Sequence, residues 1–308
     1  MRRFWALVAV LVAAAAAGCD EHGEESGNGA GAAAGGRFDA QRAFRDLRAQ
    51  VRIGPRPAGS AASRQEVRLI VERLREAGVR EVRVQHPHRN VVGHIPGESP
   101  GTVVVGAHYD TKDIPGFVGA NDGASGVAVL LELARRLSRP LRGPSIDLVF
   151  FDAEEARGPS DGPAAFAHSG DRGSAQFVRY ARSGGAQGSP PLDSIRAMVL
   201  FDMVGDCELD IPREANSDPG LYRRFADAAE EQTGGPAPFV GRSAPVIDDH
   251  SPFLGAGTPA VDLIDFDYGP GPPPGRFWHT GQDNLRHVCA RSLGAVGGPA
   301  LAALPAIR

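Results

Sequence analysis

The 308-residue sequence has only three cysteines, a single lysine (Lys112) and a net charge of −4. Three cysteines are too few for the disulfide framework of a small secreted domain. With 33 basic and 37 acidic residues, the chain has no excess of positive charge that would attract nucleic acid or an anionic membrane. Beyond the first 18 residues, no apolar stretch approaches the length of a membrane-spanning helix. The composition therefore predicts a globular enzyme or binding domain.

The N-terminus has the pattern of an export signal. Arg2 and Arg3 precede an apolar run that is too short for a permanent membrane-spanning helix. The run ends in Ala-Ala-Gly-Cys19, which resembles a bacterial lipobox with Cys19 as the lipidated residue. A plain secretory signal cleaved near the same place is the alternative. Both predict an exported protein, either a cell-envelope lipoprotein of a bacterium, held at the membrane only by a lipid on Cys19, or a secreted protein.

The remaining chain divides into a linker and one domain. Residues 1–18 are the predicted signal peptide of the lipoprotein type, and residues 19–37 are rich in Gly, Ala and Glu without an apolar period. Such a composition is typical of a flexible tether. No internal repeat or further boundary follows it, so residues 38–308 are expected to form a single domain.

Short apolar runs alternate with helical patterns along this domain. Four runs predict buried strands: Thr102–Gly106, Ile146–Phe151, Ala197–Phe201 and Ala260–Ile264. Two more strands are expected at Val79–Val84 and Asn90–His94. Helices are expected in the segments that follow Ser60, at Ser125–Leu137, Ala175–Arg182, Gly220–Glu231 and Ala290–Ile307. This alternation predicts an α/β fold in three layers, with a mainly parallel, twisted sheet between helices.

Acidic and histidine side chains follow the predicted strands. They are His108 and Asp110, then Asp152, Glu154 and Glu155, then Asp202, with Asp122 before the long helix and His279 after the fourth strand. Because the carboxyl ends of parallel strands meet at one edge of a sheet, we expect these residues to lie close together. Two histidines and several carboxylates suit zinc, and without a cation their charges would repel one another. The sequence therefore predicts a metal site at this edge.

Six motifs give a more specific indication. They are HYDTK, GFVGANDGASGVAVLLELAR, FFDAEEA, LFDMVGD, DDHSPFLGAGTPA and WHTGQDN. In this order they are similar to the glutaminyl cyclase and zinc aminopeptidase family, metallopeptidase family 28, from about Arg42 to the C-terminus. The resemblance implies a zinc exopeptidase-like (phosphorylase/hydrolase-like) fold.

The same resemblance implies a ligand set. Zinc would be held by Asp122, Glu155 and His279, and Glu154 would be the carboxylate that transfers protons. In the two-zinc aminopeptidases of this family, the residues that match His108 and Asp202 hold a second metal and the one that matches Asp122 bridges the two. In glutaminyl cyclases a single zinc is the rule. The resemblance thus leaves one or two zinc ions open.

Several features favour the cyclase branch. Trp278 directly precedes His279, where cyclases use an indole to wall the substrate pocket. Asp248 stands where aminopeptidases more often have serine, and Gly123 follows Asp122 where two-zinc enzymes commonly have Asp or Asn. The single lysine, Lys112, lies within the HYDTK motif, which suggests a role in substrate binding.

Other features depart from the animal cyclases. Ile247 stands where they have glutamine, and the tract after Glu155 lacks their tryptophan. The insertion DYGPGPPPGRF before Trp278 also reshapes one wall of the expected pocket.

These residues are compatible with three functions. In the cyclase, the substrate would be a peptide with N-terminal glutamine, Glu154 would carry the proton, Asp202 and Asp248 would orient the substrate amine, and Trp278 would exclude water. In an aminopeptidase, Glu154 would instead act as the base for a hydrolytic water. A non-catalytic binding ectodomain would be expected to lose metal ligands, whereas all five are present here.

Some supporting roles follow from position alone. Asp110 is expected to orient His108 from behind the metal site. Asp249 is expected to hydrogen-bond to His108 or to cap the next helix, and His250 is expected to be structural. Cys207 and Cys289 either pair in an oxidising compartment or remain buried thiols.

Overall fold

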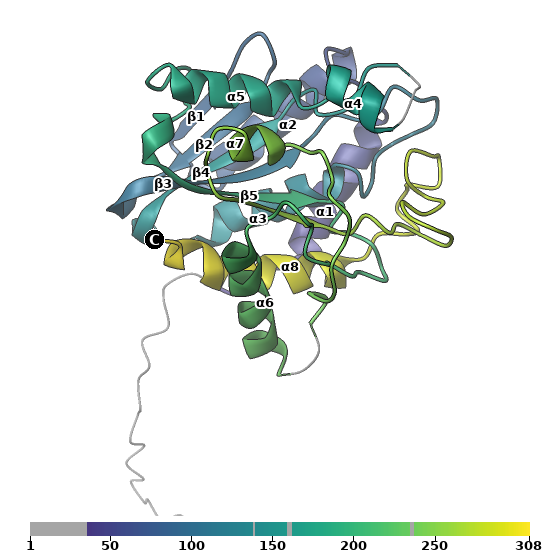
Figure 1. Ribbon diagram of the computed structural model, residues 1–308. Coiled ribbons are helices and arrows are strands. Elements are labelled where there is room, and N and C mark those ends of the chain that lie inside the picture. The colour runs from purple at the N-terminus through teal and green to yellow at the C-terminus, as the bar shows by residue number, and fades with distance from the viewer. Residues whose placement is uncertain (1–35, 138, 159–161, 235–236) are drawn as a thin grey trace, which may run out of the picture. The chain divides into compact units, whose positions relative to one another are not determined.

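A six-stranded sheet organises the computed structural model, which describes residues 36–137, 139–158, 162–234 and 237–308 (Figure 1). The predicted signal peptide, Cys19 and nearly all of the predicted tether lie outside the described residues. Within the described ranges, no helix combines the length and the apolar character needed to cross a membrane.

The strands and helices are those of an alternating α/β chain. The strands are β1 (Glu81–Val84), β2 (Val91–Ile95), β3 (Gly97–His108), β4 (Leu141–Phe151), β5 (Ile195–Asp202) and β6 (Ala260–Ile264). The helices are α1 (Ala40–Ile53), α2 (Ala61–Glu76), α3 (Ala124–Arg136), α4 (Pro163–Ser169), α5 (Arg172–Arg182), α6 (Pro219–Thr233), α7 (Ser251–Leu254) and α8 (Ala290–Ala303). Short 3-10 turns cover Leu192–Ser194 and Leu304–Ala306.

The sheet has the order β1-β2-β4-β3-β5-β6. Strands β4, β3, β5 and β6 run parallel, as the sequence predicts, whereas β1 and β2 are added antiparallel at one edge. The short connection between β1 and β2 suits their antiparallel pairing, because antiparallel neighbours need no long crossover, and β2 in turn pairs with β4. The parallel ladder aligns His108 with Phe151 and Asp202 with Ile264, so the four strands end at the same level.

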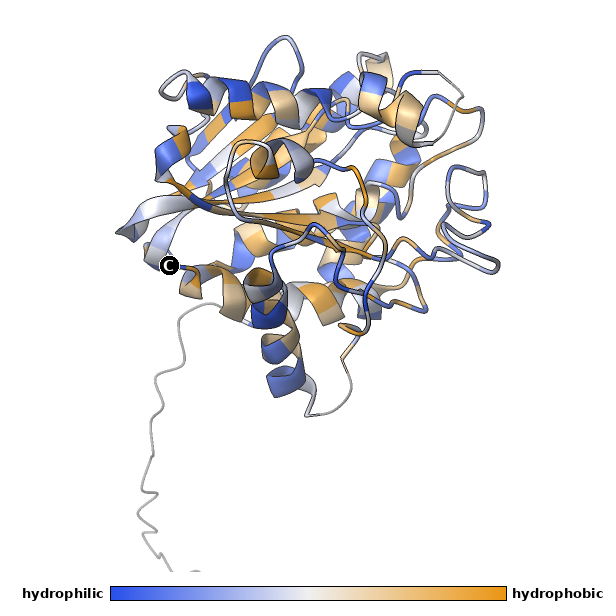
Figure 2. Ribbon diagram, in the orientation of Figure 1, coloured by the Kyte–Doolittle hydropathy of each residue, from blue (hydrophilic) through white to orange (hydrophobic). Residues whose placement is uncertain are grey.

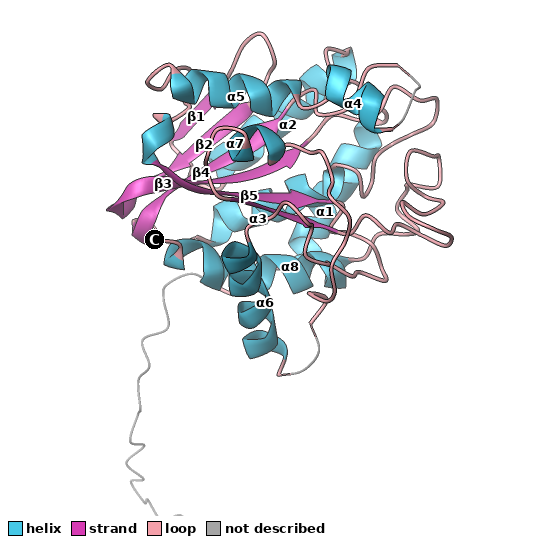
Figure 3. Ribbon diagram, viewed as in Figure 1, coloured by secondary structure: helices cyan, strands magenta, loops and turns pink. Residues whose placement is uncertain are grey.

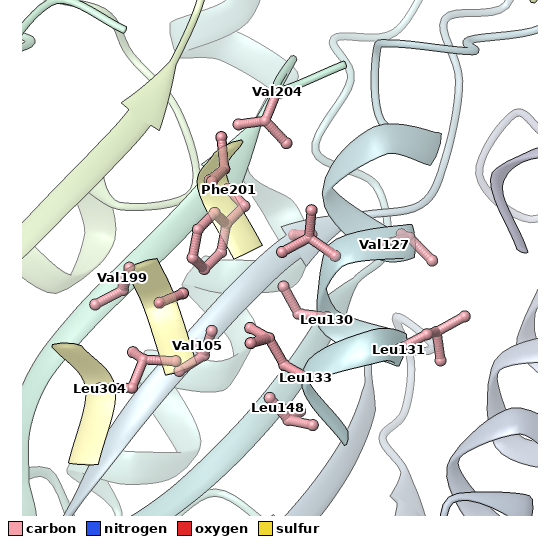
Figure 4. Packing of buried hydrophobic residues seen from close by; sticks show 14 of the residues in the cluster. Val105, Val127, Leu130, Leu131, Leu133, Leu148, Val199, Phe201, Val204 and Leu304 are labelled. Atoms are coloured by element: carbon pink, nitrogen blue, oxygen red, sulfur yellow. The ribbon is translucent and has the colours of Figure 1, made fainter. Parts of the chain in front are cut away.

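Helices cover both faces of the sheet, which confirms the predicted three layers. One apolar cluster joins one face of the strands to α1, α2, α3, α6 and α8, and a second joins the other face to α5 and α7. The central strands are mainly apolar, whereas polar residues lie on the outer sides of the helices (Figure 2). Val105, Leu148, Val199 and Phe201 of the sheet pack with Leu130 and its neighbours on α3 (Figure 4).

Helix α3 is central to the site because Asp122 stands just before it. Every residue from Ala124 to Ala134 is buried, as expected for a helix that is apolar on all sides. Gly126 allows its close approach to β5, since a Cβ there would lie 2.0 Å from the Phe201 carbonyl oxygen. The packing of α3 on the sheet thus fixes the position of its N-terminal loop.

Two helices were not predicted. Helix α1 is capped by Asp39, whose side chain accepts a hydrogen bond from the Arg42 amide, and it packs on α3 and α8. Its apolar residues Ala43, Leu47 and Val51 recur at helical spacing, so its sequence does carry a helical pattern, which the prediction missed. Helix α4 follows Gly162 in the tract after Glu155, where glycine and proline obscure any period.

Candidate active site

The predicted site residues come from the ends of strands and from the loops that follow them (Figure 3). His108 and Asp202 are the last residues of β3 and β5, and Glu154 and Glu155 follow β4. Asp122 lies in the loop between β3 and α3, and His279 lies in the long loop between β6 and α8. Segments that are far apart in sequence therefore meet at one edge, as the sequence predicts.

Asp122 stands between the two histidines. Its Oδ1 lies 3.1 Å from His108 Nε2, and its Oδ2 lies 3.4 Å from His279 Nε2. His279 Nε2 is also 3.3 Å from Glu155 Oε2, and His108 Nε2 is 3.2 Å from Asp202 Oδ1. Two groups of ligand atoms result, each within a span of 4.8 Å: Asp122 with Glu155 and His279, and Asp122 with His108 and Asp202.

Burial and crowding alter the charges of this site. Burial raises the pKa of Glu155 to about 7, and the charge of Asp122 adds to the effect. Burial also opposes ionisation of Asp122, but hydrogen bonds from His108 and His279 outweigh it and lower its pKa. The pKa of Glu154 is raised well above its ordinary value by burial and by the nearby charges of Glu155 and Asp249, although His108 opposes this.

The residues present fit a divalent zinc ion. The donor set combines imidazole nitrogen with carboxylate oxygen, which are ordinary zinc ligands. Glu155 Oε1 and His108 Nδ1 are buried without a hydrogen bond within the described ranges. A bound cation would supply the partner that the buried Glu155 oxygen lacks, and it would relieve the repulsion that raises the pKa of this carboxylate.

Glu154 belongs to a further cluster of carboxylates beside the candidate metal ligands, together with Asp171 and Asp248. Its Oε2 is 3.6 Å from His108 Nδ1, and its carboxylate lies within 4.8 Å of those of Asp171 and Asp248. Sequence reasoning singled out Glu154 and Asp248 but missed Asp171. Asp171 precedes α5, and its amide donates a hydrogen bond to the Glu154 carbonyl. Only its place beside a helix start could have signalled it, and that pattern is common.

Asp110 contacts the site differently from the expectation. Its Oδ1 is 3.8 Å from His108 Nδ1, which is too long for a hydrogen bond. Instead its carboxylate accepts hydrogen bonds from the backbone amides of Glu154 (3.1 Å) and Glu155 (3.4 Å). Asp110 therefore supports the turn that carries both glutamates, and its effect on His108 is electrostatic.

The two alternatives for Asp249 are both absent. No hydrogen bond joins Asp249 to His108 within the described ranges, and α7 begins without a side-chain cap. Asp249 is buried, and burial raises its pKa to about 7. The cap is missing because His250, and not Asp249, occupies the position before the first residue of α7.

Trp278 lies beside the candidate ligand His279. The Trp278 ring stacks on His279, with centroids 3.8 Å apart and an angle of 17° between the planes. Phe266 meets the same indole edge-on at 5.5 Å. Lys112 is buried in the loop after β3. An aromatic wall thus adjoins the ligand His279, in the place where the resemblance expects a substrate wall.

Asp283 was missed although it lies in the WHTGQDN motif. Its carboxylate accepts hydrogen bonds from the Asn121 amide (2.7 Å), the Asp122 amide (3.1 Å) and the Tyr268 hydroxyl (3.0 Å). The segment that carries His279 is thereby tied to the loop that carries Asp122. Asp283 lies only four residues after His279, but the two backbone amides that it binds lie 161 and 162 residues away in the sequence.

The alternatives for the cysteines are decided in favour of pairing. Cys207 and Cys289 form a disulfide across 82 residues of sequence. The bond joins the loop after β5 to the residue before α8. It therefore braces the segment that follows Asp202.

The parallel sheet with histidines and carboxylates at its carboxyl edge defines a protein of the zinc exopeptidase class. The chain belongs to peptidase family M28, whose model matches residues 90–304. Its similarity to a glutaminyl-peptide cyclotransferase of Bothrops jararaca is 30% identity over 280 residues, covering 76% of this chain and 72% of that protein.

Solved structures agree with this assignment. A glutaminyl cyclase of an Acidobacteriales bacterium matches with a TM-score of 0.74 and 32% identity, covering 90% of this chain and 97% of that one. The glutaminyl cyclase of Porphyromonas gingivalis has a TM-score of 0.74 and 31% identity over 87% of this chain and 98% of that one. A leucine aminopeptidase precursor from Bacteroides thetaiotaomicron has a TM-score of 0.75 and 26% identity over 89% and 99%. The fold is thus shared by both activities, and the chain is an enzyme of the glutaminyl cyclase type.

Proposed function

We propose that this protein is a zinc-dependent enzyme that cyclises the N-terminal glutamine of peptides to pyroglutamate and releases ammonia. The observation that carries the proposal is the buried group of Glu154, Asp171 and Asp248 beside the metal ligands, together with the similarity to glutaminyl cyclases. Zinc, when bound by Asp122, Glu155 and His279, supplies a Lewis acid that polarises the side-chain amide of the substrate.

In this proposal Glu154 moves the proton. The α-amine nitrogen of the substrate forms a bond to its own side-chain amide carbon, and the bond from that carbon to the amide nitrogen breaks. Glu154 accepts a proton from the amine and returns it to the departing nitrogen, which leaves as ammonia. A carboxylate that takes up and gives back a proton near neutral pH needs a raised pKa, and burial raises that of Glu154.

The neighbouring side chains orient the substrate. Asp248 is buried beside Glu154, and Asp202 is buried beside His108 and Asp122, and both are proposed to hydrogen-bond to the substrate amine. Trp278, stacked on His279, is proposed as the apolar wall that keeps water from competing with the amine, and Lys112 as a substrate contact. The partner is therefore a peptide or protein N-terminus.

A second candidate function is hydrolysis of N-terminal residues. The observation that favours it is the second group of ligand atoms, formed by His108, Asp122 and Asp202, which resembles the second metal site of the aminopeptidases. Glu154 would then act as the base for a water molecule.

Product analysis separates the two functions. The purified enzyme is incubated with a Gln-peptide and with a Leu-peptide, with and without a chelator, and the products are analysed by mass spectrometry. The proposal expects pyroglutamyl peptide and ammonia from the Gln-peptide, no turnover of the Leu-peptide and loss of turnover with the chelator. Release of free glutamine or leucine would refute it.

The location is part of the same proposal. We infer export by the N-terminal signal of a mature chain that begins at Cys19, carries a lipid on that residue and contains the domain of residues 38–308. The Cys207–Cys289 disulfide supports export, because disulfides persist in oxidising compartments. Extraction of the protein from cell envelopes only by detergent, and its release by Cys19→Ala, would be the expected result. Equal release of both forms would contradict the anchor.

A further inference from the structure

Behind the proposed site lies a buried group of charged residues that the chemistry above does not use. It consists of Glu214, His250 and Asp262, none of which is exposed. Glu214 comes from the loop before α6, His250 from the residue before α7, and Asp262 from the middle of β6. An ionisable group without contact with water needs a compensating partner, so the contacts within the group decide what it does.

His250 stands between the two acids. Its Nε2 is 3.5 Å from Glu214 Oε2, and its Nδ1 is 3.8 Å from Asp262 Oδ2. A carboxylate therefore faces each ring nitrogen at 3.5–3.8 Å, so the imidazole lies packed between Glu214 and Asp262.

Glu214 fixes this imidazole to the surrounding backbone. Its carboxylate accepts hydrogen bonds from the Val246 amide (3.1 Å), the Asn216 amide (2.9 Å) and the Ser217 hydroxyl (2.9 Å). Burial opposes its ionisation, but the contacts from His250, Asn216 and Ser217 outweigh this and lower its pKa to about 2. Val246, which Glu214 holds, is two residues before Asp248.

Ser217 extends the anchor to the sheet. Its hydroxyl oxygen also accepts a hydrogen bond from the Asp262 amide at 2.9 Å. Glu214 thus connects the loop before α6, the segment before Asp248 and strand β6. These three segments form the base on which the Asp248 turn rests.

Asp248 links this group to the proposed active site. Its carboxylate lies within 4.8 Å of ligand atoms of His250 and Asp262, and also within 4.8 Å of those of Glu154 and Asp171. The Asp249 amide donates to Asp248 Oδ1 at 2.5 Å, whereas Asp248 Oδ2 is buried without a hydrogen bond within the described ranges. Asp248 is thus the residue through which the buried group can act on a substrate.

We propose that His250, held between Glu214 and Asp262, is a positioning residue that fixes the Asp248 carboxylate where it receives the substrate amine. The proposal rests on the proposed function, because it needs Asp248 to bind an amine. The imidazole lies against the Asp248–Asp262 pair on one side and against the hydrogen-bonded Glu214 on the other, so the Asp248 carboxylate is presented in one orientation. The alternative is that the group only stabilises the fold.

A double-mutant cycle distinguishes the two. The variants His250→Asn, Asp248→Asn and the double variant are compared by kcat/KM for a short Gln-Ala peptide. Misplacing a reacting group by about 1 Å can cost about 10²-fold, so each single variant is expected to lose roughly 10–100-fold. If His250 acts through Asp248, the double variant loses little more than Asp248→Asn alone. Losses that multiply would overturn the proposal.

Two further variants separate positioning from stability. Glu214→Gln keeps an acceptor for the backbone amides but removes the charge that restrains His250. Whatever its change in melting temperature, it is expected to lose about tenfold in kcat/KM per folded molecule, mainly through KM. Full activity in Glu214→Gln would overturn the proposal. His94→Asn is the matched control, since it breaks another His–Asp contact, between His94 and Asp147 on β2 and β4, and is expected to leave kcat/KM unchanged.

The measurements also separate failure of this proposal from failure of the proposed function. If the wild type releases free amino acids instead of pyroglutamyl peptide, the proposed function fails, and the same cycle is then read on amino acid release, which also requires a bound amine. Bound zinc is measured in each variant. An unchanged zinc content is expected, and loss of a metal ion in His250→Asn would overturn the proposal by showing that His250 is a ligand.

Discussion

Two buried acidic regions of this protein are built in opposite ways. On α3, the Glu132 carboxylate is fully buried, but it is ringed by arginine: Arg42 at 2.7 Å, Arg136 at 2.8 Å and Arg135 at 3.3 Å. Burial opposes its ionisation, but the hydrogen bonds from Arg42 and Arg136 outweigh it and lower its pKa. At the carboxyl edge of the sheet, Glu154 and Glu155 have raised pKa values instead.

The comparison teaches what an unpaired buried charge indicates. Desolvation is costly for any buried carboxylate, and a protein normally compensates it with arginine or hydrogen bonds, as at Glu132. At Glu155, one oxygen lacks such a bond within the described ranges. A fold can keep this arrangement when a cation or a substrate supplies the missing partner. Perturbed acids with specific neighbours are therefore candidates for function, and compensated acids are candidates for stability.

The largest effect is expected for Glu154→Gln. Glutamine has nearly the same shape but cannot carry a proton, and general acid–base catalysis contributes about 10²–10⁴-fold. We expect kcat for a Gln-peptide to fall by that factor while bound zinc is retained, measured by steady-state kinetics and metal analysis. Glu155→Gln is the matched control and should lose zinc. A Glu154→Gln enzyme within about tenfold of the wild type would show that Glu154 is not the proton carrier.

The opposite outcome is expected at the arginine-ringed site. Glu132→Gln removes the charge that three arginines share, and hydrogen bonds to charged groups are worth about 1.5–3 kcal/mol. The free energy of unfolding, from urea denaturation, should decrease by about that amount, with kcat unchanged per folded molecule. A large loss of kcat without a loss of stability would break the distinction between the two regions.

The sequence predicted that these side chains gather at one edge of the sheet because the evidence for it is local. Each of His108, Glu154, Glu155 and Asp202 stands at the end of a run that is recognisable as a buried strand, and parallel strands end together. The direction of β1 and β2 was less visible, since pairing depends on which edge is free. Helix α1 was missed although its sequence carries both a capping residue, Asp39, and apolar residues at helical spacing.

The supporting residues could not be predicted for a different reason. Asp171, Asp283 and Glu214 act on partners in other segments, and nothing in their own neighbourhood reveals those partners. Asp283, for example, contacts the amide of Asp122, 161 residues away. A single sequence identifies residue types suited to chemistry, whereas the residues that hold them in place are recognised only when the chain is folded.

Asp283 combines features of the two regions. It is buried near the candidate metal ligands, as Glu155 is, but its carboxylate has hydrogen-bond partners, as that of Glu132 has. In Asp283→Asn, one of the two backbone amides of Asn121 and Asp122 would face an NH₂ group. Loss of support behind a ligand typically costs about 10–100-fold in metal affinity, and we expect this for zinc, measured by competition with a chelating dye. Tyr268→Phe keeps both backbone bonds and should lose less. Equal losses in the two variants would contradict this role of Asp283.

The smallest effect is expected for the partly exposed pair of His94 and Asp147. His94 Nδ1 is 2.6 Å from Asp147 Oδ1, but the His94 side chain remains 34% exposed. The hydrogen bond to Asp147 raises the pKa of His94, while burial lowers it to a smaller extent. A raised histidine pKa adds stability below the unfolded pKa near 6.5, and this stability is lost as the pH rises through the folded pKa. Solvent screening limits the effect to less than about 1 kcal/mol.

Urea denaturation of the wild type and of His94→Asn between pH 5.5 and 8.5 measures this contribution. The variant should be less stable at the acidic end, and the two should converge as the pH rises. A difference that grows with pH would mean that neutral His94 makes the stronger contact with Asp147. The pair would then depend on hydrogen bonding and not on charge, unlike the arginine-ringed Glu132. If the difference vanishes at high pH, charge compensation explains both pairs, and the acids at the carboxyl edge are distinguished by lacking it.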